Sequence, residues 1–173
     1  MRKNEAFPEP IITPSTKAAQ GEHDESVAPS ELYKRGVVDP GLYKELARIS
    51  MKLYERGVAR AADHGMIFVD TKYEFGISNG KIMLMDEVNT PDSSRYWIKD
   101  DYESRFEKGE EPRKLDKEYV RTWLSEQGFT GKGTPPKLTD DIRVEASARY
   151  MEVVEKFTGE PMQLDVGPVD ESI

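Results

Sequence analysis

A chain of 173 residues is long enough to bury one hydrophobic core but not two complete ones. Its formal charge of −8, from 33 acidic and 25 basic residues, argues against a general affinity for nucleic acid or an anionic membrane, because their phosphates require a basic surface. The sequence has no cysteine, which excludes disulfides, thiolate metal sites and a cysteine nucleophile.

Two further features bear on where the protein works. No apolar run approaches the roughly 20 residues of a membrane span, and the opening MRKNEAFPEP lacks the apolar centre of a signal peptide. Together with the lack of cysteine, these features lead us to expect a cytoplasmic protein. Because the acidic net charge disfavours nucleic acid and anionic membranes, its partner is expected to be a small molecule or another protein.

The chain begins with a proline-rich segment. Residues 1–38 contain four prolines and show no sustained periodicity, so we expect an extended arm rather than a packed element. Asp39 then offers an N-cap, with Pro40 at the first helical position. An apolar stripe with helical spacing follows, which predicts a helix from Pro40 to about residue 62.

Two strands and a loop are predicted next. Met66 to Asp70 and Lys81 to Val88 are expected to pair as an antiparallel hairpin, with Asn79-Gly80 as the turn signal. Ile82 to Met85 is apolar on both faces, which predicts that this strand is buried. Thr90 to Lys114 is polar and predicts a long loop over the sheet, of a kind that is often functional.

Two helices are predicted in the remainder of the chain. Asp116 can cap a helix that runs to Gln127 and ends at Gly128, and Thr139 can cap a last helix that ends at Gly159. We therefore predict an α+β fold in which an antiparallel sheet is flanked by helices. The predicted organisation is an arm (1–38), one α+β domain (39–162) and an acidic tail (163–173).

The predicted hairpin carries many charges for an element patterned like a core. Because strand side chains alternate between faces, Asp70, Lys72 and Glu74 share one face. A two-residue turn brings Glu87 onto that face, whereas a three-residue turn places Asp86 opposite Lys72. The residues alone leave both registers open.

In either register two carboxylates converge beside a lysine. Two negative unit charges ~4 Å apart repel by about 4 kcal/mol at an effective dielectric constant near 20, so a compensating cation is expected. Mg²⁺ binds one or two carboxylates together with water and phosphate oxygens, and a lysine can hold a phosphate. The hairpin thus favours nucleotide-dependent phosphoryl transfer. The alternative is a set of solvated residues on the outer face of an antiparallel sheet.

Four motifs follow one another along the chain: PEPIITPSTKAAQGEHDES, VDTKYEFG, DEVNTPDSSRYW and LDKEYVRTWL. In this order they resemble the phosphoribosylaminoimidazole-succinocarboxamide synthase (SAICAR synthetase) family, and the resemblance extends from about Pro8 to Gly159. It implies an ATP-grasp-like fold and an ATP- and Mg²⁺-dependent ligase of purine biosynthesis. Such a ligase joins carboxyaminoimidazole ribonucleotide to L-aspartate through an acyl phosphate.

The resemblance also implies roles for individual residues. Glu74 and Asp86 would be the Mg²⁺ ligands, which favours the three-residue turn. The remaining residues implied are Asp70, Lys72 and Glu74 for the nucleotide, Asp92, Ser94, Arg95 and Arg121 for the ribonucleotide substrate, and the catalytic residues Lys17, His23, Asp24 and Lys117 near the reacting groups.

The family carries a further domain before the proline-rich arm, and no part of this sequence resembles it. The chain therefore looks like the C-terminal portion of the enzyme. We expect it to act only with the N-terminal part, which a second chain could supply. The alternative is a non-catalytic fragment or remnant that retains a ligand-binding or assembly surface.

Overall fold

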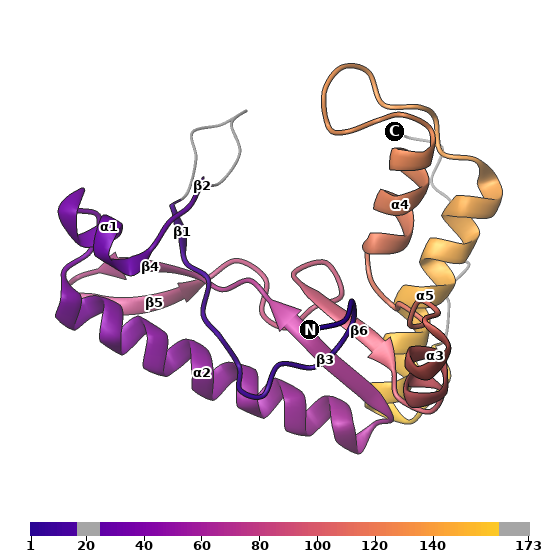
Figure 1. Ribbon diagram of the computed structural model, residues 1–173, viewed down its shortest axis with the longest axis horizontal. Helices are drawn as coiled ribbons and strands as arrows, with labels where there is room; N and C mark the ends of the chain where they lie inside the picture. Colours follow the sequence, from indigo (N-terminus) through magenta and orange to yellow (C-terminus); the bar gives the residue numbers. More distant parts are fainter. Residues whose placement is uncertain (17–24, 163–173) are drawn as a thin grey trace, which may run out of the picture. The chain divides into compact units, whose positions relative to one another are not determined.

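The computed structural model describes residues 1–16 and 25–162 (Figure 1). These residues belong to two compact units. Unit 1 combines Met1–Gly57 with Tyr73–Asp86, and unit 2 combines Val58–Lys72 with the chain from Glu87 onward. No helix among the described residues has an apolar stretch long enough to cross a membrane.

Unit 1 begins with short elements in the predicted arm. β1 (Ser15–Thr16) pairs antiparallel with β2 (Glu25–Ser26), and the helix α1 (Pro29–Lys34) buries Leu32. The prolines had led us to expect that residues 1–38 are extended throughout. The helix α1 shows that this expectation is wrong for part of the segment. Proline is tolerated at the first position of a helix, and Pro29 occupies that position in α1.

The long helix α2 (Pro40–Asp63) confirms the predicted helix and its start. Asp39 Oδ1 accepts the backbone N–H of Gly41 at 2.8 Å and that of Leu42 at 2.9 Å. The carboxylate thereby satisfies two of the N–H groups that have no partner within the first turn of a helix.

The hairpin of unit 1 differs from the prediction in its first strand and its register. It consists of β4 (Glu74–Ser78) and β5 (Lys81–Met85), and Glu74 lies opposite Met85. Asn79 and Gly80 have φ angles of +50° and +72°, so two left-handed residues complete the turn. The three-residue turn favoured by the resemblance is therefore wrong, because asparagine tolerates the left-handed region and makes a third residue unnecessary.

Unit 2 contains a second antiparallel pair, β3 (Met66–Thr71) and β6 (Ser94–Ile98). β3 was expected to pair with residues 81–88, but the chain leaves the strand after Thr71 and β4 starts a separate sheet. The long loop predicted from Thr90 to Lys114 is also wrong, because it contains β6 and the helix α3 (Tyr102–Lys108). The segment from Thr90 to Lys114 is polar at both ends, but between these ends lies β6, whose Tyr96, Trp97 and Ile98 are buried.

The helices α4 (Glu118–Glu126) and α5 (Asp140–Thr158) confirm the two predicted in the last third of the chain. The core of unit 2 is aromatic at its centre, where the ring of Tyr96 packs against Phe68 of β3 and against Phe157 of α5. The α+β class with antiparallel pairing is thus confirmed, although the described residues form three two-stranded sheets rather than one. The predicted boundaries at residues 38 and 162 stay a prediction.

Candidate functional site

The pairing of β3 with β6 creates an ion pair that the sequence had not indicated. Phe68 lies opposite Tyr96, but the next pair is Asp70 with Arg95, so Val69 is left out of the register. Such a bulge re-aims the residues that follow it. Here it puts the Asp70 carboxylate opposite the Arg95 guanidinium, where Val69 would otherwise stand.

Asp70 and Arg95 meet in a bidentate contact. Arg95 Nε donates to Asp70 Oδ1 at 2.8 Å, and Arg95 Nη2 donates to Asp70 Oδ2. This hydrogen bonding raises the pKa of Arg95 above its already high usual value. The Arg95 side chain keeps 47% of its surface accessible, so the carboxylate fixes the guanidinium while a phosphate could still reach it.

The turn before β6 is held by its own hydroxyl groups. The backbone N–H of Thr90 donates to Ser93 Oγ at 3.2 Å, the N–H of Ser93 donates to Thr90 Oγ1 at 3.2 Å, and Thr90 Oγ1 donates to Glu87. Ser94 Oγ donates to Thr71 Oγ1 at 2.8 Å and is buried. The structure thus leaves the Ser94 side chain little surface for a ligand, and its role in substrate binding stays a prediction.

Asp116 links β6 to the start of α4. Lys114 forms an isolated antiparallel β-bridge with Trp97, and the N–H of Leu115 donates to the carbonyl of Tyr96 at 2.8 Å, so residues 113–115 run alongside β6. In a continued ladder the N–H of Tyr96 would donate to the Leu115 carbonyl. It donates instead to Asp116 Oδ2 at 3.1 Å, so the side chain of Asp116 ends the ladder.

The same carboxylate starts the helix, because Asp116 Oδ1 accepts the N–H of Glu118 at 2.9 Å. Asp116 is only 3% exposed, and burial raises the pKa of its carboxyl. The helix begins at Glu118 with Lys117 at the N-cap position, so the prediction that Asp116 is the N-cap is wrong by one residue, although its carboxylate accepts the first N–H of the helix. Its second bond, to a strand 20 residues away in sequence, was not predicted.

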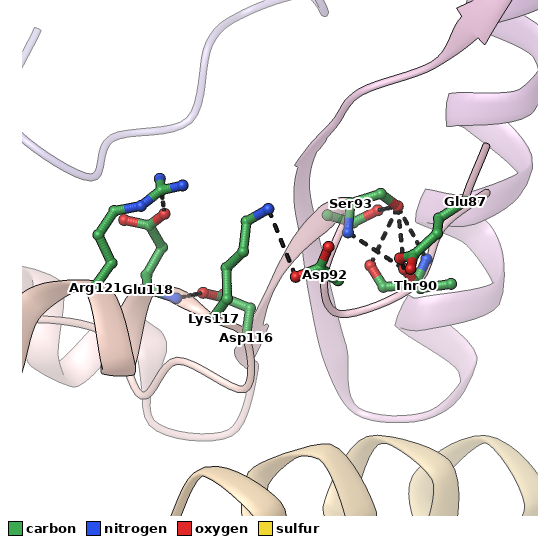
Figure 2. Close-up of polar contacts among 9 residues, drawn as sticks. Glu87, Thr90, Asp92, Ser93, Asp116, Lys117, Glu118 and Arg121 are labelled. Atoms are coloured by element: carbon green, nitrogen blue, oxygen red, sulfur yellow. Dashed lines mark hydrogen bonds and ion pairs between the residues drawn. The ribbon is translucent and has the colours of Figure 1, made fainter. Parts of the chain in front are cut away.

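Two cations lie at the start of α4, Lys117 at the N-cap position and Arg121 in the helix. Lys117 Nζ lies 3.7 Å from Asp92 Oδ1, and Arg121 pairs with Glu118 on the same helix, as Figure 2 shows. We call the polar residues at the start of α4, together with those of the turn before β6, the polar cluster. Its members are Glu87, Thr90, Asp92, Ser93, Asp116, Lys117, Glu118 and Arg121.

Tyr150 of α5 lies beside this cluster. Burial raises the pKa of its hydroxyl, and the charges of Asp92, Asp116 and Glu87 add to the shift. The sequence carried no signal for this placement, because it depends on how α5 packs in unit 2.

Two of the predicted residues lie in unit 1. Glu74 begins β4 opposite Met85, and Asp86 follows Met85 directly, so both carboxylates belong to the open end of the hairpin. Asp86 has a φ of +64°, which ends the regular alternation of the strand at that residue. Two carboxylates at one end of a hairpin fit the donor set that Mg²⁺ takes together with phosphate oxygens and water.

The predicted site residues thus fall into three groups. Unit 2 holds Asp70, Lys72, Asp92, Ser94, Arg95, Lys117 and Arg121. Unit 1 holds Glu74 and Asp86. Lys17, His23 and Asp24 lie outside the described residues.

Asp116 gives a pH-dependent prediction. Its pKa is raised in the folded state, so the folded chain binds this proton more readily than the unfolded chain, and stability from this group increases as the pH falls. We compare the unfolding free energy of the unchanged chain with that of Asp116→Asn. The difference is expected to increase in favour of the unchanged chain as the pH is lowered from about 7 to about 4, which is near the unfolded pKa of Asp. Urea unfolding at several pH values measures this difference. The control is Asp140→Asn, at an exposed position, and an equal pH trend in both variants would contradict the assignment.

Comparison with known proteins places these residues in a family. Residues 1–137 match the SAICAR synthetase family. The phosphoribosylaminoimidazole-succinocarboxamide synthase of Bacteroides thetaiotaomicron is 52% identical over 162 residues, which cover 92% of this chain and 52% of that protein. A putative phosphoribosylaminoimidazole-succinocarboxamide synthase 2 of Agrobacterium fabrum is 42% identical, with 92% and 51% covered. The chain spans about half the length of the curated relatives it matches.

Solved structures agree with this result. The SAICAR synthase of Saccharomyces cerevisiae, complexed with SAICAR, superposes with a TM-score of 0.71 at 36% identity, over 91% of this chain and 49% of that one. A type-2 SAICAR synthetase in complex with ADP superposes with a TM-score of 0.65 at 28% identity, over 91% and 55%. These neighbours confirm both the resemblance and the fold class.

Proposed function

Because the chain belongs to the SAICAR synthetase family, we propose that it forms the substrate-binding part of an ATP-dependent carbon–nitrogen ligase of purine biosynthesis. The observation that carries the proposal is the polar cluster with the neighbouring Arg95. Three cations, Arg95, Lys117 and Arg121, gather around one strand and one helix start in a chain of net charge −8. All three lie within the matched region.

The proposed reaction has two steps. A carboxylate oxygen of carboxyaminoimidazole ribonucleotide attacks the γ-phosphorus of ATP, and ADP leaves. The amine of L-aspartate then attacks the carbonyl carbon of the acyl phosphate, phosphate leaves, and the amine loses a proton as the amide of SAICAR forms. The work of the protein in such a reaction is mainly positioning and charge neutralisation.

The cations of unit 2 suit the ribonucleotide. Arg95, held by Asp70, binds the ribonucleotide phosphate, because a fixed guanidinium recognises phosphate with two parallel hydrogen bonds. Lys117 offers a point charge for the acyl phosphate, and Arg121, one helical turn further on, adds a second charge for the substrate. Asp92 positions Lys117, and the buried Ser94, which donates to Thr71 Oγ1, is assigned to the substrate-binding set as a residue that supports the neighbouring Arg95.

The nucleotide is assigned to Asp70, Lys72 and Glu74. Glu74 and Asp86 would hold Mg²⁺, which would neutralise part of the charge of the phosphates when bound. Lys17, His23 and Asp24 of the arm act near the reacting groups. The lack of cysteine favours the cytoplasm as the place of this activity.

The relatives are about twice as long as the matched region, so the ligase is proposed to act with the part of the family fold outside the 173 residues. That part is either joined to the same chain or supplied as a second polypeptide. A solved relative in complex with ADP and another in complex with SAICAR support the choice of ligands.

Isothermal titration with Mg²⁺–ATP and with carboxyaminoimidazole ribonucleotide tests the proposal, after the mass of the purified chain has been checked. We expect the ribonucleotide to bind without ATP, because its proposed cations lie together in unit 2. Formation of SAICAR is then measured after the other part of the fold has been added. Binding without turnover in that assembly would favour the non-catalytic alternative, and absence of ribonucleotide binding there would overturn the proposal.

A further inference from the structure

The hairpin of unit 1 exposes a strand whose sequence predicts burial. Met83, Leu84 and Met85 of β5 are 49%, 36% and 44% exposed, and Ile77 of β4 is 58% exposed. We call these four residues the β5 surface. The expectation that the strand is buried is therefore wrong for the part of the chain that the structure describes. A strand that is apolar on both faces normally has cover on both.

The edge of β5 is open as well as apolar. Within residues 1–16 and 25–162, β4 and β5 form a sheet of their own with two strands. Proteins usually protect an exposed edge with proline, a charge or a bulge, but Ile82 to Met85 contain neither proline nor charge and pair with β4 in regular register. An isolated two-stranded hairpin is also marginally stable in water, so a third strand would stabilise it.

Gly76 shapes one face of this surface. A Cβ at Gly76 would lie 2.8 Å from Met85 Sδ, so the missing side chain gives the Met85 thioether room to lie across β4. Met83 stands opposite Gly76 on the same face. Methionine side chains adapt to the shape of a partner, which suits this face for packing against another apolar element.

We infer that the edge of β5 pairs with an apolar β-strand from the part of the family fold outside these 173 residues. Pairing along an edge satisfies the open backbone groups and covers both faces of the strand at once, as in strand addition. A source for this strand exists, because the relatives devote about half of their length to a part that the chain does not match. The inference rests on the proposed function in so far as the ligase needs that part.

Co-expression tests the pairing without requiring either part to fold alone. The tagged chain is produced together with the unmatched half of the Bacteroides thetaiotaomicron relative, and the captured complex is analysed by hydrogen exchange. We expect co-purification, with amide exchange at Ile82 to Met85 slowed by about 100-fold relative to the chain alone. The sedimentation coefficients of the chain alone and of its Met83→Asp variant show whether a second copy covers β5 instead.

Two variants place the contact on β5. Met83→Asp and Leu84→Asp put a charge on opposite faces of the strand and are each expected to reduce co-purification by at least about tenfold, as a buried unpaired charge does. Val144→Asp is the matched control, because Val144 is 68% exposed on α5 of unit 2. It is expected to bind like the unchanged chain. Circular dichroism of each variant establishes that it is folded.

The outcomes separate this inference from the proposed function. Equal capture of all variants, or exchange at β5 that is slow in the chain alone, would overturn the pairing even if the assembly forms SAICAR. An assembly that depends on Met83 and Leu84 but forms no SAICAR supports the pairing and counts against the ligase. Capture through β5 of a second copy, rather than of the unmatched half, would also overturn it.

Discussion

Replacing Arg95 by alanine is expected to weaken ribonucleotide binding far more than ATP binding. The lost interaction is a charge-assisted contact with phosphate, which is worth about 2–3 kcal/mol. That energy corresponds to roughly 30- to 150-fold in Kd. Titration of the assembly that binds both ligands measures the two losses separately. Equal losses for ribonucleotide and ATP would contradict the role given to Arg95.

Arg105→Ala is the matched control for this experiment. Arg105 also pairs with an aspartate, since its Nε donates to Asp101 Oδ2 at 2.8 Å, but it lies on α3 and outside the proposed site. Its removal is expected to leave both affinities unchanged. Asp70→Asn separates orientation from charge, because it keeps the guanidinium while weakening the contact that fixes it. We therefore expect Asp70→Asn to cost less ribonucleotide affinity than Arg95→Ala.

The features that could be predicted were those set by neighbours in sequence. Asp39 caps α2 through N–H groups two and three residues away, and the Asn79-Gly80 turn needs only two residues with positive φ. The same applies to Thr139, whose Oγ1 accepts the N–H of Ile142 at the start of α5. Each of these signals requires no knowledge of what the element packs against.

Contacts between distant residues could not be predicted in the same way. The Asp70–Arg95 pair spans 25 residues and depends on a bulge at Val69, whereas simple alternation along the strand gives no such break. The bond from Tyr96 to Asp116 depends on residues 113–115 running alongside β6, which no periodicity in the sequence indicated. The residues of the candidate site were therefore predicted from the resemblance to a family, whereas their contacts with one another are seen only in the structure.

The β5 strand shows a different kind of limit. Four consecutive apolar side chains favour a covered strand, so the sequence predicted burial, and that prediction is wrong for the described residues. The described residues do not supply the cover. The apolar pattern indicates that β5 requires a covering element. The relatives are about twice as long as the matched region, and their additional part can supply such an element.

Replacing Glu74 by glutamine is expected to remove most of the Mg²⁺ dependence of nucleotide binding in the assembly that binds ATP. The amide keeps the shape of the side chain but lacks the charge that a hard cation prefers. Two unit charges ~4 Å apart interact by about 4 kcal/mol at an effective dielectric constant near 20, and replacement by water recovers part of this energy. We therefore expect a loss of roughly 100-fold in Mg²⁺-dependent affinity for ATP, a factor that corresponds to about 2.7 kcal/mol.

Titration of ATP with and without Mg²⁺ measures this effect, and Glu55→Gln on an exposed position of α2 is the control within unit 1. Asp86→Asn should reproduce the loss, because Asp86 follows the residue that pairs with Glu74. With the two-residue turn, Glu74 pairs with Met85 and not with Asp86. The two acids could therefore share a cation only because the backbone turns at Asp86, where φ is +64°. Unchanged Mg²⁺ dependence in Glu74→Gln would remove Glu74 from the ligand set, and a loss in Asp86→Asn alone would leave the cation to Asp86 and the phosphates.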